Sequence, residues 1–315
     1  MKPLEEFLKS LIQKYGSPCA ISAEAMADEW VLHSGLSALP CLSEIHGKLQ
    51  SYGLSLEQAT IPGLRGHHYW YRDDDPTIVY QDGEWRGAVE FTLLHELYEV
   101  MLGKLGATAS GDGCSPDADV CRGANQFAAA VLMQKDIFLQ ALYQSHFDIV
   151  WLHQHFCCSY SAIAIRAVHL LDQVEDASRR DLACVLYQRR GDPQSWHECD
   201  PADFYVDCVA CTSGLLPWSE GQTGGLLPRR GDGVSPGSIV ELSLKAGRPV
   251  LLGTTRASAA SPIANLVLLS RPVLWFGHLS KVILQGMTPE DGHALEAQAG
   301  RLQPRPITYS GSRLT

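Results

Sequence analysis

The chain has 315 residues, 45% of them hydrophobic and 19% charged, which is long enough for two domains and ordinary for a globular protein. Its formal net charge of −10 argues against a broad, sequence-independent contact with nucleic acid. No run reaches the roughly 18 apolar residues that a membrane helix needs, and the N-terminus has no apolar signal core. Ten cysteines in such a chain are typical of reduced thiols, so we expect a soluble cytoplasmic protein without a membrane partner.

The first 135 residues combine helices with a pair of strands. Apolar periodicity predicts helices over residues 1–15, 22–30, 89–103 and 119–134. Runs rich in aromatic and β-branched residues predict strands over residues 68–72 and 77–81, joined by a turn. A loop of Gly, Ser, Asp and Ala, residues 106–117, separates the last two helices.

Residues 135–175 form a helical zone. Within it, residues 147–156 and 160–171 predict two helices with a break at Cys157-Cys158-Ser159, as in a helix-turn-helix; an ordinary pair of packed helices is the alternative. Arg166 is the strong base of this segment ahead of Arg179-Arg180. Such a sparse set of bases predicts weak binding of nucleic acid at most.

Past residue 180 the chain changes to short β-rich runs. We expect strands over residues 183–187, 204–209, 238–242, 249–253, 265–269 and 273–276, and a long loop over residues 218–237. The predicted domain boundary lies near residues 175–182. The sequence therefore predicts an α+β chain with three parts: residues 1–140, a helix-turn-helix-like segment 141–180, and residues 181–315.

The helix predicted over residues 89–103 carries the main candidate site. His95 and Glu99 are four residues apart and share one helix face, so a single metal ion can take a nitrogen and an oxygen from one turn. Glu96 lies about 100° around the helix, within reach of a water bound to that ion. Zinc hydrolases usually carry H-E-x-x-H, with the Glu as general base; here the second His is a Glu. The alternative is an amphipathic helix with charges at its rim.

Three segments resemble the ImmA/IrrE-type metallopeptidases: Gly63-Leu64-Arg65-Gly66 before a strand, Leu94-His95-Glu96, and Ala124-Asn125-Gln126-Phe127-Ala128-Ala129 running into Val131-Leu132-Met133. Members are zinc-dependent endopeptidases that cleave helix-turn-helix transcriptional repressors. The IrrE-like branch regulates the DNA-damage response and continues into a helix-turn-helix and a GAF-like domain. The resemblance implies a zincin-like peptidase domain, then a helix-turn-helix, then a β-rich α/β GAF-like sensor domain, in a stress regulator.

The resemblance also implies roles for individual residues. His95 and Glu99 are expected to bind zinc, with manganese as the alternative, and Glu96 to act as general base. The family's third ligand lies one helical turn before Asn125, which is Cys121 in this chain; a buried core cysteine is the alternative for that position. Asp117 and Asp119 are further candidates for the third ligand.

The charge of this ligand set separates two hypotheses about function. A zinc site with one neutral His and the anions of Glu99 and Cys121 has a net charge near zero, so its water is less acidic. The first hypothesis is an endopeptidase that cleaves a repressor protein. The second is a catalytically impaired homologue that binds a repressor or DNA.

Two other groups carry ligand-type side chains. His197, Cys199, Cys208 and Cys211 have metal-binding residue types, but their irregular spacing across a predicted strand favours ordinary packing. His67 and His68 precede an aromatic run, and we expect them at the rim of the cleft; a place in the lining of the catalytic cleft is the alternative.

Overall fold

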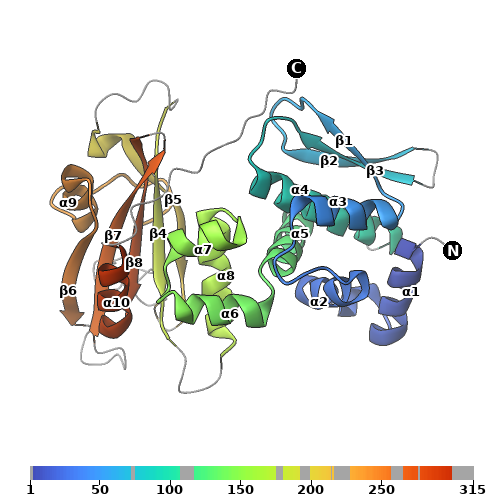
Figure 1. The fold of residues 1–315 in the computed structure, drawn as a ribbon, viewed down its shortest axis with the longest axis horizontal. Helices are drawn as coiled ribbons and strands as arrows, with labels where there is room; N and C mark the ends of the chain where they lie inside the picture. The colour runs from blue at the N-terminus through green and yellow to red at the C-terminus, as the bar shows by residue number, and fades with distance from the viewer. Residues whose placement is uncertain are drawn as a thin grey trace. The chain divides into compact units, whose positions relative to one another are not determined.

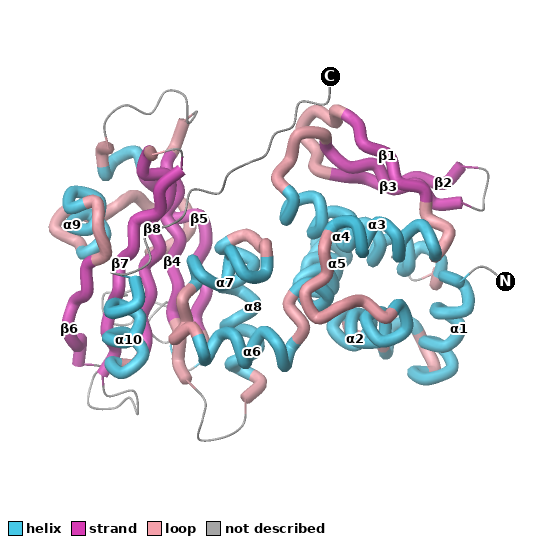
Figure 2. Tube along the Cα trace, in the orientation of Figure 1, coloured by secondary structure: helices cyan, strands magenta, loops and turns pink. Residues whose placement is uncertain are grey.

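The computed structural model describes residues 3–71, 75–106, 117–174, 180–191, 199–213, 215, 228–256, 265–275 and 277–299. It forms two compact units, Met1–Ala141 with Val150–Ala162, and Leu142–Ile149 with Ile163–Thr315. Both contain helices and a β-sheet, which confirms the predicted α+β class (Figures 1 and 2). In the part of the chain that is described, no helix has the length and apolar character to span a membrane.

The chain up to residue 172 is mainly helical, with one small sheet. Its elements are α1 (Pro3–Tyr15), the short 3-10 helix η1 (Pro18–Ala20), α2 (Ala23–Ser34), α3 (Leu42–Ser51), β1 (Ser55–Ala59), β2 (Gly66–Tyr71), β3 (Asp75–Gln81), α4 (Arg86–Lys104), α5 (Asp117–Leu132), α6 (Lys135–Gln144), α7 (Ile149–Phe156) and α8 (Tyr160–Asp172). Ser22 caps α2 by accepting a hydrogen bond from the backbone N–H of Ala25, as its place before the helix predicts. Helix α3 and strand β1 lie in a stretch for which the sequence predicts no element.

The small sheet positions the long helix α4. Its strand order is β1-β3-β2, with β1 parallel and β2 antiparallel to the central strand β3. Helix α4 packs against β2 and β3, and α5 packs against α4 and α2. The stripe predicted for α4 is fully buried, which fixes the direction of its remaining side chains; its members are Leu93, Leu94, Leu97, Val100 and Met101.

A turn joins α7 to α8 and lies on the first turn of α4. Cys157 adopts a left-handed conformation there, with φ +53°. A Cβ on Gly87 would lie 1.8 Å from the backbone oxygen of Cys157, so Gly87 permits this close approach. The pair α7 and α8 confirms the two helices and the break predicted for this segment. Whether it acts as a helix-turn-helix stays a prediction.

The second unit is built on a five-stranded antiparallel sheet with the order β5-β4-β8-β7-β6. Its elements are β4 (Ala183–Arg189), η3 (Pro201–Asp203), β5 (Phe204–Cys211), α9 (Ile239–Ala246), β6 (Val250–Arg256), β7 (Asn265–Trp275), β8 (His278–Met287) and α10 (Pro289–Ala299).

Helices α9 and α10 cover opposite faces of this sheet. Ser243 of α9 hydrogen-bonds to Ser270 of β7 at 2.6 Å, whereas Leu295 of α10 packs with Leu269 and Met287. Neighbouring strand residues such as Leu269 and Ser270 point to opposite faces, so each face has its own helix.

Two sequence predictions for this unit are wrong. Residues 238–242 begin helix α9, because Ser238 caps it by accepting from the N–H of Glu241 and Gly247 ends it with φ +62°. The two strands predicted within residues 265–276 are one strand, β7, which runs through Arg271 and Pro272. Strand β8 and helix α10 have no predicted counterpart. The loop predicted over residues 218–237 lies largely outside the described residues.

A buried ion pair anchors the segment before α7 to the sheet of the second unit. Arg271 of β7 donates to Asp148 at 2.6 Å, with both side chains at most 7% exposed. Gln285 of β8 also donates to the backbone oxygen of Phe147 at 2.7 Å. The segment predicted as residues 141–180 therefore contributes to both units, and the predicted three-part division stays a prediction.

Candidate metal centre

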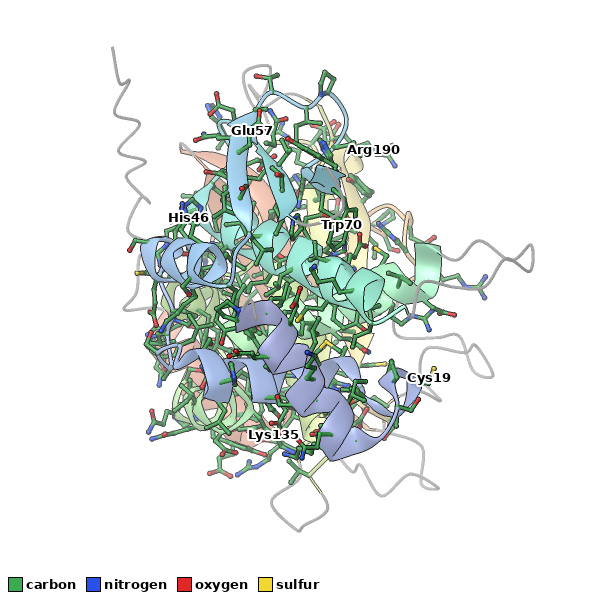
Figure 3. All side chains as sticks on the ribbon, turned by 90° about the vertical axis from the view of Figure 1, so that its right-hand side faces the viewer. Cys19, His46, Glu57, Trp70, Lys135 and Arg190 are labelled. Atoms are coloured by element: carbon green, nitrogen blue, oxygen red, sulfur yellow. The ribbon has the colours of Figure 1, made fainter. Side chains whose placement is uncertain are left out.

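Strand β2 runs alongside α4 and meets it at every second residue. A Cβ on Gly66 would lie 2.3 Å from Thr92 Cγ2. The next residue on that face, His68, reaches Glu96, and Trp70 (Figure 3) lies near the helix end, with Lys104 Nζ 5.0 Å from its ring centroid. From Gly66 to His68 the strand rises about 6.6 Å and from Thr92 to Glu96 the helix rises about 6 Å, so strand and helix advance together over this step.

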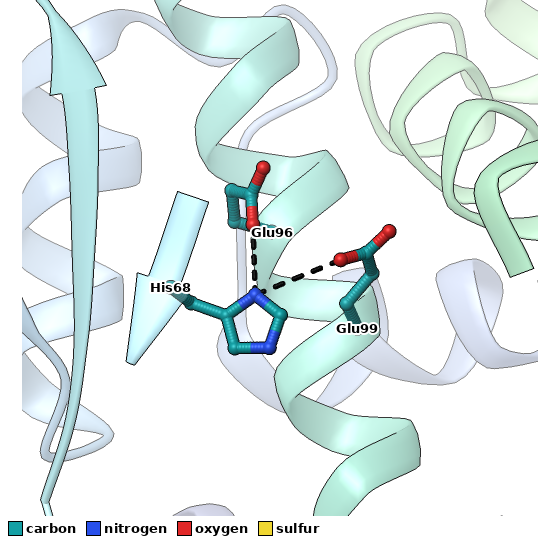
Figure 4. A group of neighbouring side chains, drawn as sticks. All are labelled: His68, Glu96 and Glu99. Atoms are coloured by element: carbon teal, nitrogen blue, oxygen red, sulfur yellow. Dashed lines mark hydrogen bonds and ion pairs between the residues drawn. The ribbon is translucent and has the colours of Figure 1, made fainter. Parts of the chain in front are cut away.

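His68 stands between two carboxylates of α4. His68 Nδ1 lies 2.8 Å from Glu96 Oε2 and 3.6 Å from Glu99 Oε2 (Figure 4). The ligand atoms of these three residues lie within 4.8 Å of one another, and only Glu96 is buried. His68 lies opposite the buried Ile78 of β3, which turns its ring toward α4.

His95 approaches the same carboxylate from the other side. His95 Nε2 lies 3.2 Å from Glu99 Oε1, whereas His68 faces Oε2. On its far side, His95 Nδ1 lies 3.1 Å from Asn125 Oδ1 of α5. Asn125 Nδ2 points to Cys121 Sγ at 3.8 Å, which orients the amide oxygen toward His95. Nδ1 therefore carries the proton that is donated to Asn125, and Nε2 is the nitrogen available at Glu99.

Burial and hydrogen bonding have opposite effects on the pKa values of His95 and Glu99. Burial lowers the pKa of His95, but the hydrogen bond and charge of Glu99, with help from Glu96 and Asn125, outweigh it, so the pKa is raised. The hydrogen bond of His95 lowers the pKa of Glu99 against the effect of burial, and the charges of His95 and His68 add to that lowering. In the absence of a metal ion, the cluster thus holds an anionic Glu99 and attracts positive charge.

The donor set fits a divalent transition-metal ion. Imidazole nitrogens and carboxylate oxygens are ordinary ligands of zinc, and manganese accepts carboxylates. A ligand His typically donates its other ring N–H to an acceptor, and Asn125 supplies that acceptor for His95. The cluster therefore has ligand atoms and one outer partner in place.

The structure places the sequence-predicted residues as follows. His95, Glu96 and Glu99 come together on α4. Cys121 is exposed, which excludes a core role, and it contacts Asn125. Within the described residues, the close ligand group of His68, Glu96 and Glu99 includes neither Cys121 nor His95. Asp119 is exposed, and the side chain of Asp117 lies outside the described residues.

The other candidate group is not assembled. His197 lies outside the described residues, and Cys199, Cys208 and Cys211 form no ligand group among the residues that are described.

Sequence reasoning put His68 at the rim and gave Asn125 no role. No spacing rule could have found His68, because it is 28 residues from Glu96 and only strand pairing brings it there. For Asn125, the signal was present in the matched segment, one helical turn after Cys121.

Comparisons with known proteins match the segment that carries these residues and the fold of the chain. Residues 54–168 match the family model described as the IrrE N-terminal-like domain, which is a peptidase family. A solved structure of a Mycobacterium tuberculosis transcriptional regulator has a similar fold, with a TM-score of 0.56 and 14% sequence identity over 97% of this chain and 87% of that chain. No curated protein sequence matches the chain.

The fold and the site therefore define a chain with a peptidase-like domain built on β2, α4 and α5. The segment that matches the IrrE N-terminal-like model contains all three of these elements, in agreement with the resemblance seen in the sequence.

Proposed function

We propose that this chain is a transcription regulator whose zincin-like domain is a metal-dependent endopeptidase acting on a helix-turn-helix repressor. The observation that carries the proposal is the carboxylate of Glu99, which lies between two imidazoles and beside Glu96 on one helix. His95 and Glu99 would hold the ion, which is zinc, with manganese as the alternative. When bound, such an ion polarises the scissile carbonyl and makes its water more acidic.

The side chains around that position have separate tasks. Glu96 is buried next to Glu99 and accepts a proton from water, which it then passes to the leaving amine. Asn125 holds the His95 ring so that Nε2 faces the ligand position. The match to the peptidase family supports this division of tasks.

The regulatory part of the proposal rests on the second unit and on the relatives. The second unit has its own sheet and core, as a GAF-like sensor domain requires. The similar fold of a transcriptional regulator supports a role in transcription, here in a stress or DNA-damage response. Arg166, the strong base of the helix-turn-helix-like segment, is 4% exposed, which favours a repressor protein over DNA as partner. The cytoplasmic location stays a prediction.

A second candidate function is a catalytically impaired regulator that binds its repressor without cleaving it. One observation favours it: His68 donates to Glu96 at 2.8 Å, so the general base is already occupied. The Glu in place of the second motif His points the same way.

The test uses the full chain with the variants His95→Ala and Glu96→Gln. Wild type and Glu96→Gln should bind about one equivalent of zinc, and His95→Ala should bind none, because His95 is a ligand in this proposal and Glu96 is not. A panel of helix-turn-helix repressors from the source organism is then tested for cleavage. Cleavage by wild type that Glu96→Gln abolishes supports the peptidase. Repressor binding without cleavage supports the second candidate.

A further inference from the structure

The carboxylate of Glu99 has an imidazole at each oxygen, one from α4 and one from β2. Two zinc ligands at about 2.1 Å with a tetrahedral angle are about 3.4 Å apart. His95 Nε2 lies 3.2 Å from Glu99 Oε1 and His68 Nδ1 lies 3.6 Å from Glu99 Oε2, so each separation is near that value but at a different oxygen. Among the described residues, the three ligand atoms within 4.8 Å of one another belong to His68, Glu96 and Glu99, so His68 is already in the close group and His95 adjoins it through Glu99. The 2.8 Å between His68 and Glu96 is instead an ordinary hydrogen-bond length.

We propose that His68 is the third protein ligand of the metal ion, in place of Cys121, so that strand β2 and helix α4 together form the site. This inference rests on the proposed function, because it concerns the same ion. His68 lies on the face of β2 that looks toward α4, between the contacts of Gly66 and Trp70 with that helix. Those contacts fix the strand, so His68 needs only a rotation of its side chain to reach the ion.

Hydrogen-bond capacity points to a cation at this nitrogen. His68 Nδ1 carries at most one proton, yet two carboxylates face it, and the side chain of Glu96 is 8% exposed. Two partly buried carboxylates close together are unfavourable unless positive charge lies between them. One proton on Nδ1 serves Glu96 alone, and Glu99 receives its hydrogen bond from His95 at Oε1, whereas a divalent ion at this position would serve both carboxylates.

The resulting ligand set has the usual composition of a zinc peptidase. Two histidines and one glutamate hold zinc in thermolysin-type sites. Here His68 and His95 supply the histidines, and Glu99 supplies the carboxylate from the motif position where a histidine is usual. A carboxylate thus stands where the second motif histidine is usual, and a histidine stands in place of the usual carboxylate ligand. The net charge of the zinc site is the same as in the usual arrangement, +1. The argument that a thiolate and a carboxylate would leave the bound water weakly acidic therefore does not apply.

Cys121 lies on the side of His95 away from the proposed ion. Asn125 contacts both of them, His95 at Nδ1 and Cys121 at Sγ, whereas His95 presents Nε2 to Glu99. A ligand should be on the Nε2 side. Cys121 thus sits beside the residue that orients His95, and His68 sits where the ligand is needed.

The role of His68 also links metal binding to the state of the general base. The same nitrogen donates to Glu96 or binds the ion, and it cannot do both, because a ligand nitrogen has no proton. If His68 Nδ1 held the ion, its proton would lie on Nε2 and Glu96 would be free to accept a proton from water.

The experiment compares zinc affinity and the number of imidazole ligands in the full chain. Affinity is measured by competition with a chromophoric chelator, and the ligand count by X-ray absorption at the zinc edge. His68→Gln should lower the affinity by at least about tenfold, since even outer partners of ligands contribute about 10–100-fold. It should also reduce the imidazole count from two to one.

The matched control is His67→Gln, on the same strand but with its side chain on the opposite face. It and Cys121→Ser should leave affinity and imidazole count unchanged, and thermal melting confirms that all variants fold. Two imidazoles in His68→Gln, or sulfur scattering that disappears in Cys121→Ser, would overturn the role of His68. If His68 is not a ligand but His95→Ala still removes the metal, only the role of His68 is wrong and the proposed metal-dependent function stands. A wild-type protein without affinity for zinc would contradict both the role of His68 and the proposed function.

Discussion

His95 of α4 donates from Nδ1 to Oδ1 of Asn125 on α5 at 3.1 Å, while Asn125 Nδ2 lies 3.8 Å from Cys121 Sγ. The amide therefore has one defined orientation, and it selects one tautomer of the imidazole. The ring of His95 is already held with Nε2 toward Glu99, so it loses little rotational freedom when a metal ion binds. The relationship joins two helices whose motifs are about thirty residues apart in the sequence.

Replacement of Asn125 should weaken metal binding without removing a ligand. Asn125→Ala is expected to lower zinc affinity by about 10–100-fold, whereas Asn125→Asp keeps an acceptor for His95 and should retain most of it. Chelator competition measures both. Gln126→Ala, at the next exposed position of α5, is the control and should behave as wild type. Equal affinity in Asn125→Ala and wild type would show that the orientation of His95 has another origin.

The approach of β2 to α4 depends on the absence of a side chain at Gly66. In Gly66→Ala the new Cβ would lie 2.3 Å from Thr92 Cγ2 and 3.4 Å from Glu96 Oε1, so strand and helix must separate. We expect a loss of about 1–3 kcal/mol in the free energy of unfolding, as for other overpacked sites. Zinc affinity should fall as well, because His68 moves with the strand.

Two further variants test whether the contact between the new Cβ and Thr92 causes the loss of stability. Their free energies of unfolding are measured from denaturation curves. Thr92→Ser removes the methyl group that the new Cβ meets, so the double variant with Gly66→Ala should regain part of the lost stability. Gly47→Ala on the exposed side of α3 has open space and should stabilise by about 0.5–1 kcal/mol. A Gly66→Ala protein as stable as wild type would mean that the contact is easily relieved.

The sequence predicts those elements whose signals are local. The helices predicted over residues 22–30 and 89–103 and the break at Cys157 all depend on neighbours in the chain, and the structure confirms them. Residues 238–242 show the limit of this reasoning. Their apolar run suits a strand, but Ser238 and Gly247 act as caps, and a helix forms between them.

The candidate site is predictable only along one helix. Helical spacing puts His95, Glu96 and Glu99 together, since residues four apart share a face. The contribution of His68 depends on the register of β2 against β3 and on the missing side chain of Gly66. Strand register and close packing depend on residues far apart in the chain, so the local sequence pattern does not predict them.

The ion pair of Arg271 with Asp148 should be important for the stability of the second unit. Its atoms are 2.6 Å apart and both side chains are buried, so replacing Arg271 removes the buried positive charge that faces the Asp148 carboxylate. Arg271→Met is expected to cost about 3–5 kcal/mol in chemical denaturation, and the double variant with Asp148→Asn should recover part of it. Lys245→Ala breaks an exposed pair and should cost less than about 1 kcal/mol. A mild effect of Arg271→Met would mean that water enters the site.

Stability should depend on pH through Glu90 of α4. Burial raises the pKa of Glu90 more than Arg86 lowers it. The folded protein therefore binds this proton more tightly than the unfolded chain, and the resulting stability is present below the unfolded pKa and lost as pH rises through the folded pKa. Glu90→Gln should accordingly gain stability relative to wild type between about pH 4 and pH 7. Denaturation at both pH values tests this, with the exposed Glu6→Gln as control; a constant difference would contradict it.

The last prediction exchanges the two ligand types that this chain has placed in an unusual order. His68→Glu leaves one histidine and two carboxylates around the ion, and Glu99→His leaves three histidines, so each single variant changes the charge of the site by one. The double variant restores two histidines and one glutamate, now with H-E-x-x-H on α4 and the carboxylate on β2. If both residues bind the same ion, the double variant should hold zinc more tightly than the product of the single effects predicts, by about tenfold or more, which corresponds to about 1.4 kcal/mol of coupling. The control cycle pairs Glu99→His with His67→Glu on the opposite face of β2, and it should be additive. Additive behaviour in both cycles would mean that His68 and Glu99 do not share a ligand sphere, and the third ligand would then have to be sought on α5.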